Sequence, residues 1–400
     1  RVSNDLHRTT CIARTTRPDV IGPELAVFDA GLRDSYQTAL SHSFDDREWE
    51  NFTFSISHGG HGARTIQIYS YAAYLASFAE SKSFVTAYLD YIGQWIDLDA
   101  LSGEQALIDE FGQRFGVDDT EALWSSLPSQ HMLSMIIDSF RAERFKDSLY
   151  SIVDKARFNA ASAPCAGAWL EAKPTRDALT LGNDEFRIAC CYRYGWSMFT
   201  TEFHSICHDC GDQLDARGLH ALVCGNHNNL WTVRHDLIRD VLYFWAKKGN
   251  FTVEKEKYGL LLGGKKPADV FIYVYKNGRS YAFDVAVASP FKKGVLRSAA
   301  QHQLAAAEDK AREKWDKYGV ETADKAWKFV PVCFEALGGF SGRARMCIET
   351  IAKRAARNIN VPKCVVIQCI SREISAILAR GAASLALRRM IPRDHFFIDC

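Results

Sequence analysis

Apolar residues recur at helical spacing through most of the first half of the chain. Segments 22–36 and 66–78 each predict a helix, and segment 120–158 carries apolar residues at positions i, i+3 and i+4 along its length. A Gly-Asn-Asp break at residues 182–184 precedes one more helical pattern at 185–194. We therefore expect residues 1–200 to form a mainly helical region.

Shorter apolar runs, separated by helical patterns, follow residue 230. In chain order they predict a helix, three strands, a helix, a strand and a helix. The segments are 234–248, 251–257, 268–275, 280–288, 296–318, 329–334 and 342–358. This order predicts an α/β domain after the helical region.

A sharp turn at Asn277-Gly278 joins the second and third of these strands. Both central residues of a type I′ turn need a positive φ, which this dipeptide supplies. Pairing outward from the turn places Asp269 opposite Ala286, two positions along from Asp284 on the same face. The two aspartates are then diagonal neighbours, with Cα atoms about 7–8 Å apart. Two carboxylates at that distance could share a divalent metal ion.

The opposite face of this hairpin is apolar and is expected to face a core. It carries Val270, Ile272, Val274, Tyr281, Phe283, Val285 and Val287. The alternative is that Asp269 and Asp284 are two acids on a solvated face with no metal between them. Acids are depleted in strands, and like charges on one face repel each other, so we favour the metal-site interpretation.

The composition is that of an ordinary globular protein of two or three domains. Of 400 residues, 47% are hydrophobic and 24% are charged, and the formal net charge is +1. A basic surface for nucleic acid must therefore be local. Residues 1–25 lack the apolar core of a signal peptide, and no apolar run approaches the roughly 20 residues that span a bilayer. We expect an intracellular protein with no membrane partner and, because it begins with Arg1, a piece of a longer one.

One cysteine-rich segment has the ligand types and the spacing of a structural zinc site. Zn²⁺ takes four sulfur or nitrogen ligands tetrahedrally, and each short loop lets two ligands converge. Because the segment is poor in apolar residues, metal binding would provide much of its stability. The expected ligands are Cys207, Cys210, His220 and Cys224. Three other histidines could replace His220, namely His204, His208 and His227. The alternative is a chance grouping of reduced thiols among the twelve cysteines.

These patterns divide the chain into four predicted parts. They are a helical region at 1–200, a CCHC zinc knuckle at 201–230, the α/β domain at 231–360 and a basic helical tail at 361–400. The C-terminal part is locally basic, through Arg343, Arg345, Lys353, Arg354, Arg357, Lys363, Arg372, Arg380, Arg388, Arg389 and Arg393. Such a run could face the phosphates of a nucleic acid, or it could simply be a solvated surface.

The acid pair resembles the PD-(D/E)xK nuclease plan, in which the first Asp lies on one strand and the second acid on its neighbour. That plan implies a lysine two residues after Asp284, to orient the attacking water or neutralise developing charge, but the residue there is Ala286. A lysine must then come from elsewhere, and we expect Lys310, or alternatively Lys314, on the following helix. Weaker candidates are Lys257, Lys292 and Lys293.

Other polar residues around the hairpin could extend the site. Glu254 and Glu256, two apart on the first strand, could add a metal ligand or could be an exposed strand edge. Arg234, His235 and Asp236 are predicted to open the preceding helix. Asp236 favours a helix N-terminus, whereas Arg234 and His235 could also meet phosphate.

In this order the motifs resemble the C-terminal half of non-LTR retrotransposon polyproteins that carry a restriction-enzyme-like endonuclease. In that family a reverse transcriptase is followed by a helical region, a CCHC zinc knuckle and the nuclease. The weaker matches are GGHG at 59–62, AAYLAS at 72–77, AGAWL at 166–170 and EFR at 185–187. The more specific matches are the knuckle, RHD at 234–236, PAD at 267–269, and Asp284 followed by SP at 289–290.

The resemblance implies an endonuclease that uses Mg²⁺ or Mn²⁺ to nick target DNA, so that the exposed 3′ end primes reverse transcription. It also implies action in the nucleus, with the element RNA as a further partner and the knuckle as a nucleic-acid contact. No polymerase pair of the Tyr/Phe-x-Asp-Asp type is present, so this chain should not polymerise. Ala286 leaves two alternatives: a catalytically dead or domesticated nucleic-acid-binding module, and a structural protein stapled by zinc.

Overall fold

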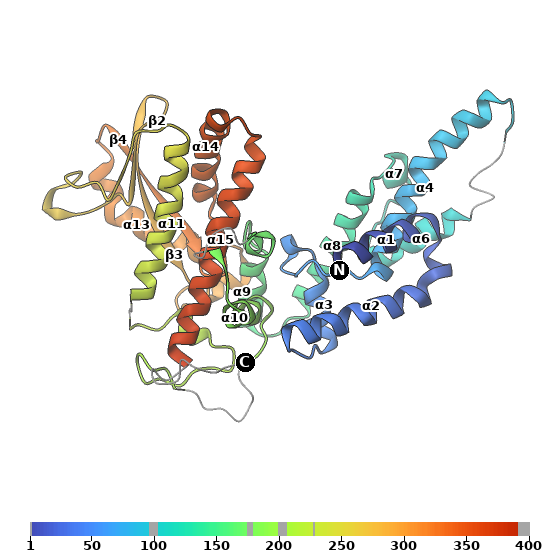
Figure 1. Cartoon of the computed structure of the whole chain (residues 1–400), viewed down its shortest axis with the longest axis horizontal. Helices are drawn as coiled ribbons and strands as arrows, with labels where there is room; N and C mark the ends of the chain where they lie inside the picture. The colour runs from blue at the N-terminus through green and yellow to red at the C-terminus, as the bar shows by residue number, and fades with distance from the viewer. Residues whose placement is uncertain (1, 96–102, 174–178, 199–205, 227–228, 391–400) are drawn as a thin grey trace. The chain divides into compact units, whose positions relative to one another are not determined.

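The computed structural model of the chain describes residues 2–95, 103–173, 179–198, 206–226 and 229–390 (Figure 1). They form two compact units. One consists of Arg1–His58 with Gly62–Ser148, and the other of Gly59–His61 with Leu149–Cys400. The predicted helical region 1–200 is thus divided, because its last part packs with the second unit. There, α9 (Ile152–Ala161) lies on α12 (Leu296–Gln301), and α10 (Asn183–Tyr194) lies on α15 (Lys363–Met390).

All the secondary-structure elements described in the first unit are helices. Its helices are α1 (Val2–Thr15), α2 (Pro18–Leu40), α3 (Asp46–Thr53), η1 (Ile56–His58), α4 (Ile66–Tyr91), α6 (Glu104–Phe115), α7 (Thr120–Ser125) and α8 (Gln130–Asp147). The core forms where α4 meets α6 and α8, around the buried Leu75, Phe111 and Ile137. The continuous pattern at 120–158 is divided among α7, α8 and α9, because Ser129 and Ser151 cap new helices within it.

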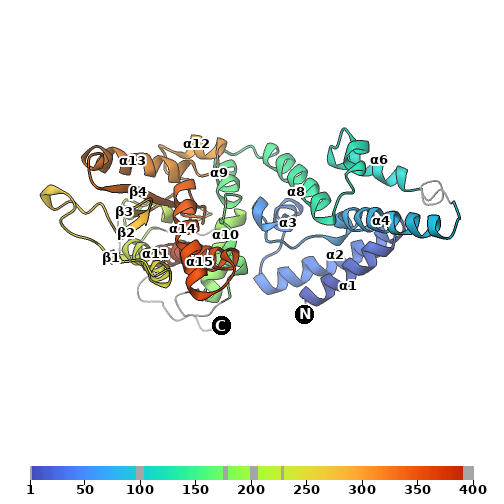
Figure 2. The same ribbon diagram turned by 90° about the horizontal axis from the view of Figure 1, so that it is seen from above.

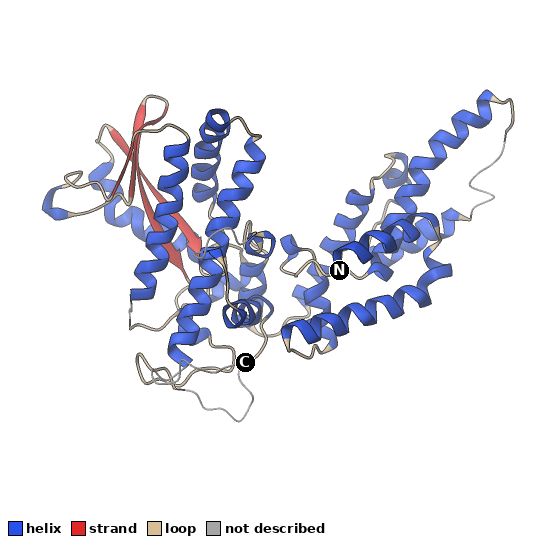
Figure 3. Cartoon of the chain, viewed as in Figure 1, coloured by secondary structure: helices blue, strands red, loops and turns tan. Residues whose placement is uncertain are grey.

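The second unit contains a four-stranded mixed sheet, the strands drawn in red in Figure 3. β1 (Val253–Lys255), β2 (Val270–Lys276) and β3 (Arg279–Ala288) form an antiparallel meander, and β4 (Trp327–Glu335) pairs with β3 in parallel. α11 (Asn229–Lys248) precedes the meander, α12 and α13 (Ala305–Thr322) connect β3 to β4, and α14 (Gly342–Ile359) follows. The predicted order of elements is therefore confirmed. The predicted helix at 296–318 is interrupted before Leu304, whose φ is 63°.

Helices cover both faces of this sheet. Figure 2 shows α13 on one side of the strands, with α11, α14 and α15 on the other. On the α13 side, Ala286 and Cys333 of the strands pack against Ala307 and Ala311 of the helix. The face that carries Asp284, which the alternative interpretation had left solvated, is thus covered by α13. A parallel strand pair reached through a crossover helix is normally covered in this way.

The last described helix, α15, is part of the core of the second unit. Ile374, Leu378 and Leu385 are fully buried, and the helix packs against α10, α11 and α14. A basic helical tail was predicted at 361–400; its described part is helical, and apolar and small residues on several faces of this helix pack it into the second unit. Within the described parts of the chain, no helix is both long enough and apolar enough to cross a bilayer.

Candidate functional site

The register of the β2–β3 hairpin differs from the predicted one. The turn pairs Lys276 with Arg279, as predicted, whereas farther along Ile272 pairs with Tyr281. Three residues of β2 therefore lie opposite one residue of β3 between these pairs, which makes a bulge. Val274 in the bulge has a φ of 46° and is 62% exposed, so it is absent from the apolar face to which the alternation had assigned it.

The shifted register moves Asp269, which immediately precedes β2, to Phe283, where pairing with Ala286 had been predicted. Val270 pairs with Phe283, and the Asp269 N–H donates to the Phe283 carbonyl oxygen at 2.9 Å. The two aspartate side chains are neighbours, and Asp269 contributes to a raised pKa of Asp284. Asp269 Oδ2 also accepts a hydrogen bond from the Val285 N–H at 2.6 Å. The bulge therefore shifts Asp269 along β3 from its predicted position, and the two carboxylates remain neighbours.

Lys314 on α13 is the cation that contacts this acid pair. Its Nζ lies 2.9 Å from Asp284 Oδ2 and 3.1 Å from Oδ1. Lys310, one turn earlier on the same helix, instead pairs with Glu313 at 2.7 Å. The structure thus places the alternative candidate, and not the preferred Lys310, against Asp284. The two lysines lie on one helical stripe, and sequence spacing alone does not say which turn of the helix reaches the carboxylate.

Burial and charge separate the ionisation of the two aspartates. Burial raises the pKa of Asp284 to about 6, against the opposing charge of Lys314 and with support from nearby Asp269. Burial also disfavours the charged form of Asp269, but the hydrogen bond and charge of His235, the Val285 N–H and Lys314 together outweigh burial and lower the Asp269 pKa below its ordinary value. Asp284 likewise outweighs the burial of Lys314 and raises the lysine's pKa. The site therefore combines one readily ionised carboxylate with one that is protonated in mild acid.

α11 supports the acid pair from the other side. His235 Nε2 lies 3.0 Å from Asp269 Oδ2, and His235 Nδ1 lies 3.2 Å from Asp236 Oδ1. The hydrogen bond with Asp269 is the main cause of a raised His235 pKa. Arg239 donates to Asp236 at 2.9 Å and also to Glu256. The sequence reasoning missed Arg239, although its i,i+3 spacing from Asp236 is a signal of such pairing.

Asp236 had been predicted to mark the start of its helix, and this prediction was wrong. α11 begins at Asn229, so Asp236 lies within the helix, and its partners there are His235 and Arg239. The neighbouring Arg234 points elsewhere and is nearly fully buried. Adjacent residues of a helix project about 100° apart, which explains why Arg234 and His235 do not share partners.

The remaining acidic and lysine candidates lie outside the acid pair. Glu254 accepts hydrogen bonds from Lys257 at 2.8 Å and from the Tyr273 hydroxyl at 2.6 Å. Glu256 approaches Asp269 only through its backbone, its N–H donating to the Asp269 carbonyl oxygen at 2.9 Å. Two further lysines are exposed, Lys292 and Lys293.

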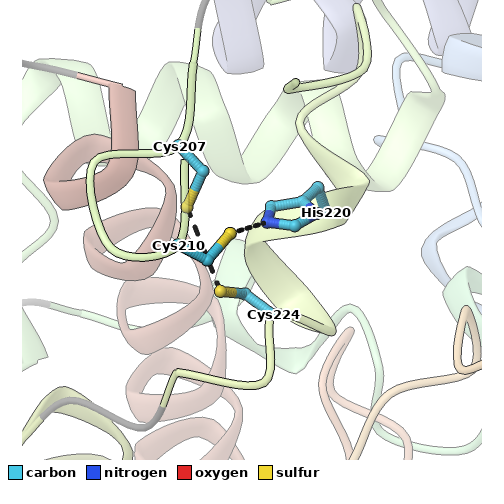
Figure 4. A group of neighbouring side chains, drawn as sticks. All are labelled: Cys207, Cys210, His220 and Cys224. Carbon is cyan, nitrogen blue, oxygen red and sulfur yellow. Dashed lines mark hydrogen bonds between the residues drawn. The ribbon is translucent and has the colours of Figure 1, made fainter. Parts of the chain in front are cut away.

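A second group of side chains is the Cys₃His cluster shown in Figure 4, formed by Cys207, Cys210, His220 and Cys224. All four ligand atoms lie within 4.8 Å of one another. Cys210 Sγ is 3.2 Å from His220 Nε2, and Cys207 Sγ is 4.0 Å from Cys224 Sγ. The predicted convergence is confirmed, and the cluster can hold a metal ion such as zinc. Of the three alternative histidines, His208 is exposed outside the cluster, while His204 and His227 lie outside the described residues.

Arg389 of α15 fixes the Cys₃His segment to the rest of the second unit. This side chain is fully buried, and its Nε donates to Asp209 Oδ2 at 3.0 Å. Its other nitrogens donate to the carbonyl oxygens of Ala221 and of Asn226, the latter at 2.9 Å. The guanidinium thus ties three points of the Cys₃His segment to one helix. The sequence reasoning counted Arg389 as part of a basic surface and missed this role.

Other arginines of that expected surface also have intramolecular partners. Arg372 pairs with Glu171 at 3.1 Å, and Arg380 with Glu185 at 3.2 Å. Arg354 lies 3.9 Å from the centre of the Phe251 ring. Arg393 lies outside the described residues. The charges at these described positions are therefore partly compensated by neighbouring side chains.

The Gly-rich segment at 59–62 forms a packed turn. Gly59 and Gly62 have φ values of 84° and 83°, which favour glycine. Buried Arg193 donates to the Gly60 carbonyl oxygen through Nε at 3.1 Å and through Nη2 at 3.0 Å. The glycines of this segment are therefore explained by a packed turn.

Sequence comparison adds no family to this description. No protein-family model matches the chain, and no curated protein is significantly similar to it in sequence. The function has to be argued from the geometry of the acid pair and of the Cys₃His cluster.

Proposed function

We propose that the chain is a metal-dependent DNA endonuclease whose acid pair is Asp269 and Asp284. The observation that carries the proposal is the contact of Lys314 with buried Asp284, whose carboxylate neighbours Asp269. Two carboxylates and a lysine are the parts that the PD-(D/E)xK resemblance implies. The order of α11, the β1–β3 meander, α13, β4 and α14 supports a restriction-endonuclease-like arrangement for residues 231–360.

The acid pair suits Mg²⁺ or Mn²⁺ bound with water and substrate. Mg²⁺ keeps several waters and usually binds through one or two carboxylates together with phosphate oxygens. Asp284 Oδ2 is buried and, although close to Lys314 Nζ, accepts no hydrogen bond of good geometry from the described residues. Apart from the Cys₃His cluster, no three His, Cys, Asp or Glu side chains come within ligand distance in the described parts. Beside Lys314, Asp284 Oδ2 can still bind a cation whose other ligands are water and substrate.

The chain's own residues have distinct roles in this proposal. A bound metal would polarise the scissile phosphate and lower the pKa of an attacking water. Lys314, which Asp284 keeps protonated, would orient that water or neutralise the charge that develops on the phosphate. His235 would hold Asp269 Oδ2 in place, together with the Val285 N–H.

The packing around Ala286 accounts for the missing strand lysine. Ala286 is 6% exposed and packs against Ala307 and Ala311 of α13. A lysine there would have to displace the helix, whereas Lys314 reaches Asp284 from that helix without doing so. The proposal therefore assigns to Lys314 the role that the family pattern gives to a strand residue.

The biological reaction is proposed from the resemblance. The enzyme would nick one strand of target DNA in the nucleus, so that the 3′ end primes reverse transcription of the element RNA. The Cys₃His cluster would carry structural Zn²⁺ and, with neighbouring basic side chains, contact nucleic acid. The alternative is a non-catalytic nucleic-acid-binding module that keeps the same fold.

Nicking of supercoiled plasmid tests the proposal and its alternative. The full chain is assayed with Mg²⁺, with Mn²⁺ and with EDTA, beside Asp284→Asn and the control Glu254→Gln, whose partners are Lys257 and Tyr273. We expect metal-dependent nicking by the wild type and the control, and a loss of at least about 100-fold in Asp284→Asn. DNA binding without nicking under all three conditions would reject the endonuclease and favour the binding module. Loss of folding in Asp284→Asn, read by circular dichroism, would make the acid structural.

A further inference from the structure

A pocket of about 230 Å³ lies between α11 and α15. Leu237 and Ile377 form part of its apolar wall. Its polar lining consists of Arg234, Arg380 and Ser384. Two guanidinium groups and a hydroxyl are all able to donate hydrogen bonds, so the pocket is suited to an anion.

Arg234 enters this pocket with unused donors. The residue is 2% exposed, and neither Nε nor Nη1 has a hydrogen-bond partner in the described parts of the chain. Its guanidinium lies 4.9 Å from the centre of the Trp231 ring, a contact that uses its face and not its N–H groups. Burial lowers the Arg234 pKa to about 10, so the group remains charged near neutral pH. A buried cation with unpaired donors is strongly unfavourable unless an anion joins it.

The facing helix is shaped to admit this arginine. A Cβ at Gly381 of α15 would lie 2.5 Å from Arg234 Cδ and 2.9 Å from Cγ. Glycine inside a helix destabilises it by roughly 1 kcal/mol relative to alanine. The chain therefore carries two unfavourable features at one pocket, a buried unpaired charge and a helix-interior glycine. Both are explained if the arginine must stay at this position to bind a ligand.

The other polar groups limit the nature of that ligand. Arg380 lies 3.2 Å from Glu185, and the Ser384 hydroxyl donates to the same carboxylate at 3.0 Å. Glu185 offsets part of the charge of Arg380 but makes no ion pair with Arg234 in the described structure. The net lining thus remains positive, and its volume admits a single tetrahedral oxyanion. Guanidinium groups recognise phosphate through paired N–H donors.

We propose that the Arg234 pocket binds a phosphate group of a nucleic-acid strand. This inference rests on the proposed function, which supplies the nucleic acid. His235, the next residue, contacts Asp269, so one turn of α11 would bind a backbone phosphate on one side and support the acid pair on the other. The phosphate could be an internal phosphodiester or the terminal phosphate of a strand, and both offer the same oxygens.

Binding of fluorescent DNA in EDTA tests the pocket separately from cleavage. Arg234→Met keeps the length of the side chain and removes its charge, and Arg372→Met is the control on α15, because Arg372 pairs with Glu171. We expect Arg234→Met to weaken binding about tenfold at low salt. It should also reduce the slope of log K against log[salt] by about 0.9 for duplex DNA, as expected for one lost phosphate contact. The control should keep the wild-type slope.

Two further measurements keep the test decisive. Strands with and without a 5′-phosphate distinguish the sources, because only a terminal site depends on that group. Gly381→Ala, which would displace Arg234, should weaken binding in the same way if Arg234→Met fails to fold.

Removal of the unpaired buried charge of Arg234 should leave the melting temperature unchanged or raise it. Unchanged affinity and salt slope, or a large fall in melting temperature with normal binding, would overturn the proposal and make Arg234 a packing residue. Loss of nicking with pocket binding intact would count only against the endonuclease.

Discussion

Lys314 of α13 and Asp284 of β3 form an ion pair across the helix–sheet interface, with Nζ 2.9 Å from Oδ2. Asp284 is 4% exposed, because α13 covers this face of the sheet between β3 and β4. The helix therefore buries the carboxylate and also supplies its counter-charge. The same arrangement explains why a small residue, Ala286, follows two positions later.

The first prediction compares the two lysines of α13. Lys314→Met should reduce nicking at least about 100-fold, because it removes the cation that contacts Asp284. Lys310→Met should keep nicking within about threefold of the wild type, since Lys310 pairs with Glu313. Initial rates of plasmid nicking at saturating Mg²⁺ measure both. Comparable losses in the two variants would mean that both lysines contact the substrate. A loss in Lys310→Met alone would mean that Lys310 is the lysine of the site, as the sequence had suggested.

The second prediction concerns the pH dependence of nicking. Burial raises the pKa of Asp284 to about 6, and a protonated carboxyl group is a poor metal ligand. The rate should therefore rise as pH increases through about 6 and level off above it, with bound metal moving the midpoint to lower pH. Rates between pH 5 and 8 at two Mg²⁺ concentrations measure this. A flat profile would mean that Asp284 is ionised throughout and that its burial does not control activity.

The third prediction concerns the Cys₃His cluster. The wild-type chain should bind one Zn²⁺ per molecule, and Cys210→Ser should lose it, because the four ligand atoms meet within 4.8 Å. The matched control is Cys364→Ser, an exposed thiol outside the cluster. Elemental analysis gives the zinc content, and hydrogen exchange should show loss of protection in the cluster segment while β2 and β3 stay protected.

Zinc retained by Cys210→Ser would show that another residue completes the site. Loss of protection in the sheet as well would show that the cluster stabilises the whole second unit. That result would point to Arg389, which joins the segment to α15.

Local sequence signals predicted the order of elements and the convergence of the Cys₃His side chains. Asn277 and Gly278 have φ values of 53° and 72°, as the type I′ turn requires. The four residues of the Cys₃His cluster are close in sequence, so short loops largely determine their convergence. Such features depend on a few neighbouring residues and are therefore readable from the chain.

The features that were not predicted depend on contacts distant in sequence. The bulge at Val274 accompanies the burial of Tyr275, whose hydroxyl donates to the Cys347 carbonyl oxygen on α14 at 2.9 Å. The choice of Lys314 over Lys310 depends on how far α13 is displaced along β3 and β4. The burial of α15 depends on α10, α11 and α14. None of these arrangements has a local pattern that fixes it.

The last prediction concerns Glu335, at the end of β4. This residue is 1% exposed, its Oε1 accepts a hydrogen bond from the Ala306 N–H at 3.0 Å, and Oε2 has no partner among the described residues. Burial raises the Glu335 pKa to about 7, although the Ala306 and Ala307 N–H groups act against it. The carboxyl group thus binds the first turn of α13, which carries Lys314, while it is largely protonated below neutral pH.

The sign of the effect on stability follows from this raised pKa. Because the folded state binds the proton more tightly than the unfolded state, the stabilisation is complete below the unfolded pKa and is lost as pH rises through about 7. Glu335→Gln cannot ionise but keeps an oxygen for the Ala306 N–H. Relative to the wild type, the variant should therefore gain about 2–3 kcal/mol in unfolding free energy between pH 4 and pH 8. Urea unfolding at several pH values measures the gain, and the control Glu321→Gln, which changes an exposed acid of α13, should show none. A constant difference between variant and wild type would mean that Glu335 is ionised in the folded protein, with solvent reaching the N-terminus of α13.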